Sequence, residues 1–270
     1  THDRSGNYGA WDYAYNILNT CEQDAVIFTN GDNDTFPLWY LQEVEKIRKD
    51  VKVVNLSLLN THWYIKQLKD FEPKIKIGLT DRQIEERLHP QRWETRTVKA
   101  STPDTLPPMK WKMKPTIQGR GIRVQDLMIW QIIQANNWER PIYFAVTVST
   151  QNLIGLRKAG YLQMEGLAYK LHPKKMDDRL DVDQMRKNIL EVYKYRNLDD
   201  PDVYFNNDAQ KLVGNYRSSF FQLALRYMRQ DDFERVVNIL QEMEDRMPEE
   251  IFPFRTEQMS IQFSMMFHRA

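Results

Sequence analysis

The residues best suited to chemistry form one polar run, NGDNDT at 30–35, directly after the apolar residues 25–28. Two carboxylates spaced two residues apart are hard oxygen ligands for a divalent ion that bridges phosphates, so Asp32 and Asp34 are the metal-ligand candidates. Asn, Gly and Asp are also the residues expected in a strand-to-helix turn with side-chain caps. The run therefore predicts either a metal-binding loop or a structural turn.

Several familiar motifs do not fit the chain. A phosphohydrolase loop needs Asp-x-Asp-x-Thr, and Phe36 stands where the threonine would be. Counted from Asn30, an EF-hand loop needs Gly at its sixth position and Glu at its twelfth, but the sequence has Thr35 and Leu41 there. No Gly-x-Gly-x-x-Gly, Walker, Gly-x-Ser-x-Gly or His-Glu-x-x-His motif occurs elsewhere. The sequence thus gives no support to the common nucleotide-binding and hydrolase classes.

Two apolar runs around the polar run predict a βαβ unit. Residues 25–28 and Val51–Leu58 are rich in strand formers, and an apolar stripe with helical spacing lies between Leu38 and Ile47. Thr35 is the expected helix cap. Because open α/β sheets bind ligands at the carboxyl ends of their strands, we expect the polar segments after both strands to lie together. This gives a candidate binding loop of Asn30, Asp32, Asn33, Asp34, Thr35, Asn60 and His62.

Further periodicities extend this unit to a complete domain. Residues 122–135 have an amphipathic helical pattern, Ile142–Val148 predicts a third buried strand, and Tyr161–Leu171 predicts a hairpin or an edge strand. Alternating strands and helices predict an α/β fold, here a Rossmann-like parallel sheet with flanking helices. The residues expected to be almost fully buried are Val26, Phe28, Val54, Leu56, Phe144 and Val146.

The stretch Pro90–Gly121 is the longest irregular part of the chain, with one expected strand at Thr95–Ala100. Before it, Thr80 and Gln83 have the spacing of a capping box and predict a helix start. The segment Lys110–Arg123 is basic, and we expect it to be either a loop that contacts phosphates or anionic lipid head groups, or a solvated loop.

After residues 174–178 the pattern changes to consecutive helices, which predicts an α/β domain at 1–175 and an α-helical tail at 176–270. Eight tail residues have the spacing of one 34-residue tetratricopeptide repeat (TPR): Phe220, Leu223, Ala224, Tyr227, Val236, Leu240, Met243 and Pro248. Only one such unit is convincing. The tail is therefore expected to be a TPR-like hairpin, or a helix hairpin that simply buries one face.

Composition narrows the class of protein. Lys plus Arg number 38 and Asp plus Glu 37, a balance that argues against nucleic acid as a partner. Cys21 is the single cysteine, so no intrachain disulfide forms. No apolar run approaches the ~20 residues of a membrane span. The chain lacks an initiator Met, and we expect it to be part of a longer protein.

The segment FTNGDNDTFPLWYLQEVEKIRKDVKVVNLSLLNTHWYI, residues 28–65, closely resembles the hallmark segment of a group of large bacterial membrane proteins. These are similar to protein O-mannosyltransferases and are placed in glycosyltransferase family 117. HDRSGNYGAWDYAYNIL at 2–18 and IRVQDLMIWQIIQANNWERPIYFAVTVS at 122–149 are also similar to them. The resemblance covers most of residues 1–170.

This resemblance implies that the whole protein has a bundle of membrane helices and takes sugar from a polyprenyl-phosphate donor. The catalytic carboxylate of such enzymes lies in the membrane part, so no catalytic residue and no cofactor is expected in this chain. The chain is then expected to be an outward-facing accessory domain on the periplasmic side of a bacterial inner membrane. It would recognise the acceptor or cover the active site, with its own transmembrane domain and an acceptor protein or glycan as partners.

Two other functions stay open from the residues alone. One is a metal-dependent enzyme domain that binds a sugar nucleotide through Asp32 and Asp34. The other is a protein–protein interaction module that acts through the helical tail. Whether the chain itself is an enzyme is not decided by its sequence.

Overall fold

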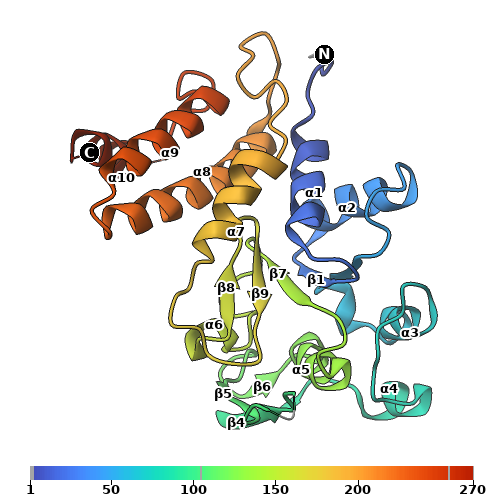
Figure 1. Ribbon diagram of the computed structural model, residues 1–270. Helices are drawn as coiled ribbons and strands as arrows, with labels where there is room; N and C mark the ends of the chain where they lie inside the picture. The colour runs from blue at the N-terminus through green and yellow to red at the C-terminus, as the bar shows by residue number, and fades with distance from the viewer. Residues whose placement is uncertain (1–2, 104, 255, 270) are drawn as a thin grey trace. The chain divides into compact units, whose positions relative to one another are not determined.

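The computed structural model describes residues 3–103, 105–254 and 256–269 (Figure 1). The chain divides into two compact units. One unit consists of Cys21–Met164 and Ala168–Arg179 and contains the β-sheet; the other is helical and consists of Thr1–Thr20, Glu165–Leu167 and Leu180–Ala270.

The first unit is built on a five-stranded sheet with the order β2-β1-β7-β9-β8. The strand β1 (Val26–Thr29) pairs in parallel with β2 (Lys52–Asn55) on one side and with β7 (Ile142–Ala145) on the other. Next to β7, the antiparallel hairpin of β8 (Leu162–Met164) and β9 (Ala168–Leu171) closes the sheet. The predicted α/β fold with a parallel core is confirmed.

The parallel strands are apolar because both of their faces are covered. All four residues of β1 and of β7 are buried. Phe28 and Phe144 lie side by side in register, with ring centroids 4.9 Å apart. Of the residues expected to be buried, Val26, Phe28, Val54, Leu56 and Phe144 are all fully inaccessible. Val146 is only half-buried, because β7 ends at Ala145 and the chain turns there.

Helices connect the strands of this unit. They are α2 (Asp32–Glu43), the short 3₁₀ turn η1 (Leu58–Asn60), α3 (His62–Asp70), α4 (Asp81–Arg87), α5 (Val124–Asn136) and α6 (Leu156–Ala159). The predicted capping box is present at α4: the Thr80 hydroxyl accepts from the Gln83 N–H at 3.2 Å, and the Gln83 side chain accepts from the Thr80 N–H at 2.9 Å.

The stretch expected to be irregular holds two small antiparallel ladders. One pairs β3 (Gln91–Arg92) with β6 (Gly121–Ile122), and the other pairs β4 (Arg96–Ala100) with β5 (Met109–Met113). The expected basic loop is therefore partly a strand.

The outer face of the β4–β5 hairpin is basic. Along β5, Met109, Trp111 and Met113 are buried, while Lys110 and Lys112 between them are exposed. Lys99 of β4 is directly opposite Lys110. Two like charges placed across from each other repel, so this face is suited to contact with an anion.

The second unit consists of helices. They are α1 (Gly9–Thr20), α7 (Val182–Lys187), the π-helical turn η2 (Asn188–Val192), α8 (Asn207–Met228), α9 (Phe233–Arg246) and α10 (Glu257–Arg269). The predicted hairpin is α8–α9, and seven of its eight pattern residues are buried; Pro248 is half-buried. That this hairpin is a TPR-like repeat stays a prediction. In neither unit do the described residues include a helix long and apolar enough to cross a membrane.

Arg140 ties together the edge of the sheet at which the parallel strands begin. Its guanidinium group donates to the backbone carbonyls of Asp24 and Ala25 at 2.5 and 3.2 Å. It also donates to the carbonyls of Asp50 and Lys74 at 3.0 and 2.7 Å. The planar fork of an arginine can reach several acceptors at once, which a lysine cannot do.

We therefore expect Arg140→Met, which keeps the apolar stem, to lower the free energy of unfolding by about 2–4 kcal/mol, since it leaves four carbonyls without this donor. Urea unfolding measures the change. Arg82→Met is the control, because Arg82 is exposed and its ion pair is with Glu86 one turn away; its expected effect is within ~0.5 kcal/mol. An equal effect of both substitutions would contradict the role given to Arg140.

Candidate functional site

The strand order places the candidate site between β1 and β7. The chain leaves β1 for β2 on one side and later returns to β7 on the other side of β1. Successive connections thus diverge from β1, and the crevice at the carboxyl ends of β1 and β7 is the topological switch point of the sheet. Open α/β sheets bind their ligands at such a point.

The polar run predicted as a loop is mostly the first turn of a helix. Helix α2 starts at Asp32, and Gly31 is its N-cap with φ of 80°, a conformation that favours glycine. No side chain caps this helix start. Thr35 is not the cap, contrary to expectation, because it lies one turn inside the helix and donates its hydroxyl to the Gly31 carbonyl at 2.6 Å.

A buried hydrogen-bond network fixes this turn against β2. The side-chain amide of Asn55, at the end of β2, donates to the Thr35 hydroxyl at 2.9 Å and to the Gly31 carbonyl at 3.3 Å. The Thr29 and Thr35 hydroxyls lie 2.8 Å apart. Thr29, Thr35 and Asn55 are all at most 1% exposed. The start of α2 is therefore held rigidly at the carboxyl edge of the sheet.

The two candidate carboxylates differ in environment. Asp32 and Asn33 are exposed, whereas Asp34 is 5% exposed. Burial raises the pKa of Asp34, and the Thr147 hydroxyl and the Asn30 backbone N–H offset part of that shift. Thr147 follows β7, so the buried carboxylate lies at the switch point.

A chain of polar contacts joins the three segments around this point. The side-chain N–H of Asn152 donates to the side-chain oxygen of Asn30 at 3.2 Å. The guanidinium group of Arg123 donates to the side-chain oxygen of Asn152 at 2.8 Å. Arg123 also forms a two-pronged ion pair with Asp126 at 3.0 and 3.1 Å. We call Asn30, Asp34, Arg123, Asp126, Thr147 and Asn152 the switch-point cluster.

Asn60 and His62, which follow β2, have structural partners of their own. Asn60 accepts the Gln125 backbone N–H at 3.0 Å and donates to the Gln125 side chain at 2.9 Å, so it caps α5 from another segment. The Nε2 of His62 is 2.6 Å from the Leu88 carbonyl, which fixes the end of α4. Neither residue is bonded to the switch-point cluster by any contact in the described ranges.

Asp126, Thr147 and Asn152 are the members of the cluster that the sequence analysis missed. Asn152 follows the third predicted strand, Ile142–Val148, and the rule that polar residues after a strand lie at the ligand edge applied there as well. Thr147 lay inside that predicted strand, which in the structure ends at Ala145. Arg123 was assigned to the basic loop instead. The polar residues after the third strand could have been noted from the sequence. The strand order was needed to show that they, and not the residues after β2, lie beside Asn30 and Asp34.

The arrangement can bind a polar partner but offers no compact metal cage. Asp32 and Asp34 are two residues apart in a helix, so a rotation of roughly 200° about the helix axis separates them and their side chains point to nearly opposite sides. Among the residues that the structure describes, no three His, Cys, Asp or Glu side chains are grouped to hold a metal ion. What faces solvent is the uncapped start of α2 with Asp32 and Asn33, beside the amides of the cluster.

Fold and site together define an open α/β domain with a polar cluster at the switch point of its sheet. The chain belongs to the family described as TMEM260-associated domain 2, whose model matches residues 10–87 and 91–189, more than half of the chain. The match includes the whole switch-point cluster and ends before α8.

One curated relative is "Protein O-mannosyl-transferase tmem260" of Dictyostelium discoideum, which is 27% identical over 62 residues. That alignment covers 23% of this chain and 8% of the relative, so the chain corresponds to a small part of that protein. No solved structure matches. These similarities support a relationship to O-mannosyltransferase-like proteins.

Asp34→Asn is expected to raise the free energy of unfolding at pH 7, because it removes the desolvation cost of a charge whose pKa is raised above the ordinary 3.8. At a pH between the Asp34 pKa of the unfolded chain and the raised Asp34 pKa of the folded protein, the folded wild type binds more protons than the unfolded chain. The wild type therefore gains stability as the pH falls through this interval, and its difference from the variant shrinks.

Urea unfolding between pH 7 and pH 4 tests this expectation. Asp32→Asn is the matched control, since it removes an exposed carboxylate from the same helical turn. If Asp34→Asn were less stable than the wild type at pH 7, the ionised carboxylate would be held favourably by its partners and the prediction would fail.

Proposed function

We propose that this chain is an accessory domain of a membrane glycosyltransferase similar to the protein O-mannosyltransferases, and that it recognises the acceptor protein. The observation that carries the proposal is an exposed apolar stripe on α2 that begins beside the switch-point cluster. Family membership and the named relative support the proposed class of parent protein, and the surface of α2 supports the proposed role.

The stripe consists of Phe36, Tyr40 and Val44, which are 51%, 49% and 61% exposed. Their spacing of four residues places Phe36 and Tyr40 on one face of α2, and Val44 continues that face at the C-cap of the helix. Trp39 stacks on Phe36 with centroids 5.7 Å apart and widens the surface. Exposed aromatic groups beside polar ones are typical of the surfaces by which proteins bind other proteins. A protein that covers Phe36 also approaches Asp32 and Asn33 in the turn before it.

The proposed parent protein rests on the resemblance of residues 28–65 to family 117 glycosyltransferases. In this proposal its membrane helices hold the catalytic carboxylate and take sugar from a polyprenyl-phosphate donor. The present domain lies outside the membrane, on the periplasmic side in a bacterium, next to its own transmembrane domain. Active-site cover is the alternative role for the same surface, and the kinetic test below separates the two.

The outer face of the β4–β5 hairpin supports a position close to a membrane. Lys99, Lys110 and Lys112 are exposed there, and Lys99 is directly across from Lys110. Each lysine close to an anionic lipid surface contributes about 1 kcal/mol to binding. We therefore propose that this face contacts anionic head groups.

In the intact parent enzyme, the double substitution Phe36→Ser and Tyr40→Ser is expected to raise KM for the acceptor protein about 10–30-fold, because two anchoring aromatic groups are lost. KM for the sugar donor should not change. Both side chains are exposed, so the melting temperature should stay near that of the wild type. Steady-state kinetics with each substrate varied in turn makes the measurement.

Trp63→Ser is the control, because Trp63 is 58% exposed but lies on α3. It should leave the acceptor KM unchanged. A fall in kcat with an unchanged acceptor KM in the double variant would favour active-site cover instead of acceptor recognition. An unchanged kcat and KM would remove the stripe from the function altogether.

The lipid contact has its own test. Replacement of Lys110 and Lys112 by Gln is expected to weaken the affinity of the chain for anionic phospholipid vesicles about 20–30-fold, since each lost charge costs ~1 kcal/mol. Co-sedimentation with the vesicles measures this affinity. The same two replacements at Lys174 and Lys175, outside the hairpin, form the control. Equal binding of both variants would argue against the hairpin face as the contact.

A further inference from the structure

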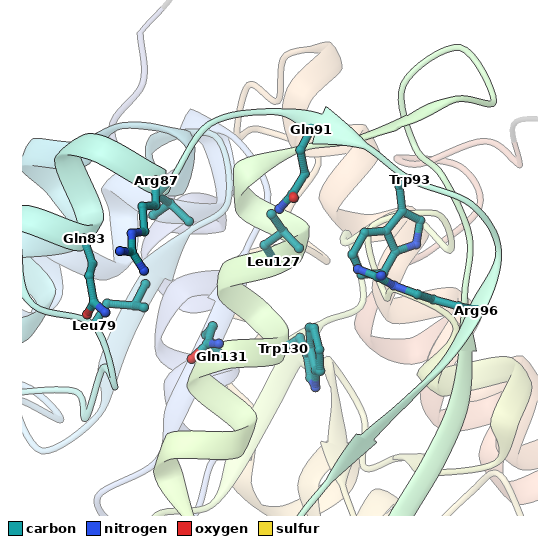
Figure 2. Close-up of a pocket in the computed structure, with 10 residues that line it drawn as sticks. Leu79, Gln83, Arg87, Gln91, Trp93, Arg96, Leu127, Trp130 and Gln131 are labelled. Atoms are coloured by element: carbon teal, nitrogen blue, oxygen red, sulfur yellow. The ribbon is translucent and has the colours of Figure 1, made fainter.

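A second, separate site lies between α4, α5 and the strands that follow α4. A pocket of about 240 Å³ is formed there by residues of the sheet-containing unit alone. Figure 2 shows Gln83 and Arg87 of α4 on one side, Trp93 and Arg96 on the opposite side, and Leu127 and Gln131 of α5 between them. No step in the proposed function uses these residues.

Two indole rings form a rigid wall of this pocket. Trp130 donates its ring N–H to the Lys99 carbonyl at 2.8 Å, and Trp93 donates to the Met113 carbonyl at 3.1 Å. The two rings meet edge to face, with centroids 6.4 Å apart. Because both N–H groups are already bonded, the rings are held in place. Trp93 is 3% exposed and the Arg96 guanidinium group covers its ring, so the half-buried Trp130 is the ring that offers an apolar face to a ligand.

Besides the two tryptophans, the pocket is lined by Leu79, Leu88 and Leu127 and by five hydrogen-bonding side chains without a negative charge. Three are the primary amides of Gln83, Gln91 and Gln131. A primary amide both donates and accepts hydrogen bonds, as a hydroxyl group does. Arg87 and Arg96 add donors, and the guanidinium group of Arg96 is stacked 3.4 Å from the centre of the Trp93 ring. Among the described residues that line the pocket there is no Asp or Glu, so a cationic ligand is disfavoured.

The size of the pocket limits its occupant. Sites for drug-sized ligands enclose about 300–1,000 Å³, and this one lies below that range. The ligand must combine an apolar face, which packs on an indole ring, with several groups that donate and accept hydrogen bonds around its edge. One sugar ring has this pattern, because its C–H groups are weakly positive and are attracted to the negative face of an aromatic ring.

We propose that this pocket binds one hexose-sized unit of a carbohydrate. The ring packs against the indole wall, and the amides and arginines bind its hydroxyl groups. The inference rests on the lining of the pocket and not on the role of α2, so binding is measured on the 270-residue chain alone and its failure would leave the acceptor proposal untouched.

The test uses the chain with ¹⁵N-labelled tryptophan and the methyl glycosides of glucose, galactose, mannose and glucuronic acid. Each glycoside is titrated to ~50 mM, because a binding free energy of less than ~4 kcal/mol corresponds to a Kd above a millimolar. We expect at least one glycoside to shift the indole N–H signals of Trp93 and Trp130 in a saturable manner. The signal of Trp138 should not move, because this indole binds the Ser101 carbonyl outside the pocket.

Matched variants assign the binding to the pocket. Gln131→Ala is expected to weaken binding about 5–10-fold, whereas Gln134→Ala, an exposed glutamine three residues further along α5, should not change it. Trp130→Phe keeps an aromatic ring and identifies the Trp130 signal by its absence. Should Trp130→Phe fail to fold, the Gln131 and Gln134 pair still decides the question.

Three results would overturn the proposal. The first is the absence of saturable shifts with every glycoside. The second is an equal effect of the Gln131 and Gln134 substitutions. The third is a shift of the same two signals by an unglycosylated peptide at lower concentration than by any sugar, which would make the pocket a peptide site.

Discussion

The side-chain amide of Asn55 joins the two parts of the sheet unit on which the candidate site depends. β2 ends at this residue, and its side chain accepts the Leu58 N–H at 3.0 Å while donating to Gly31 and Thr35 at the start of α2. Asn55 is 1% exposed, so an apolar replacement would leave the Leu58 N–H without this acceptor, at a cost of ~1–3 kcal/mol, and would remove one donor each from Gly31 and Thr35. The local geometry of the polar run follows from this one amide, because it holds the helix start where no side chain caps it.

Polar contacts of this kind occur at both edges of the sheet, and the strands between them are apolar. At the edge where the strands begin, the charged fork of Arg140 binds four carbonyls. At the edge where they end, amides and hydroxyls lie together with the Arg123–Asp126 ion pair of the switch-point cluster. An arginine suits the first edge because its planar guanidinium group donates to several carbonyl groups at once. At the second edge Arg123 is paired with Asp126, and burial raises the pKa of Asp34.

The sequence was sufficient to predict those elements of the fold that a local residue pattern determines. The apolar runs around Val26 and Val53 gave the parallel pair, and Thr80 with Gln83 gave the helix start of α4. The hairpin strand β5 was missed although Met-Lys-Trp-Lys-Met alternates as a strand with one buried face should, because the prolines around it favoured a loop. The site was only partly predictable, since the grouping of Asn30 with Asn152 depends on strand order, and no local pattern encodes which strand lies beside β1.

Which residues belong to each unit also depends on contacts between distant parts of the chain, and this affects how the helical tail can be studied. The sequence pattern divides the chain at residue 175, whereas α1 belongs to the helical unit. The Asp12 carboxylate, 2% exposed, accepts from the Arg196 backbone at 2.7 Å and from its guanidinium group at 2.6 Å, and the Asn16 amide donates to the Lys194 carbonyl and the Tyr216 hydroxyl. A chain that ended at residue 175 would lack these partners and would expose the face of α1 that packs on η2 and α8. Loss of a partner on deletion of the tail would therefore report misfolding of α1 as readily as loss of an interaction surface. Substitutions on exposed positions of α9 avoid this ambiguity, because they leave Arg196 and Tyr216 in place.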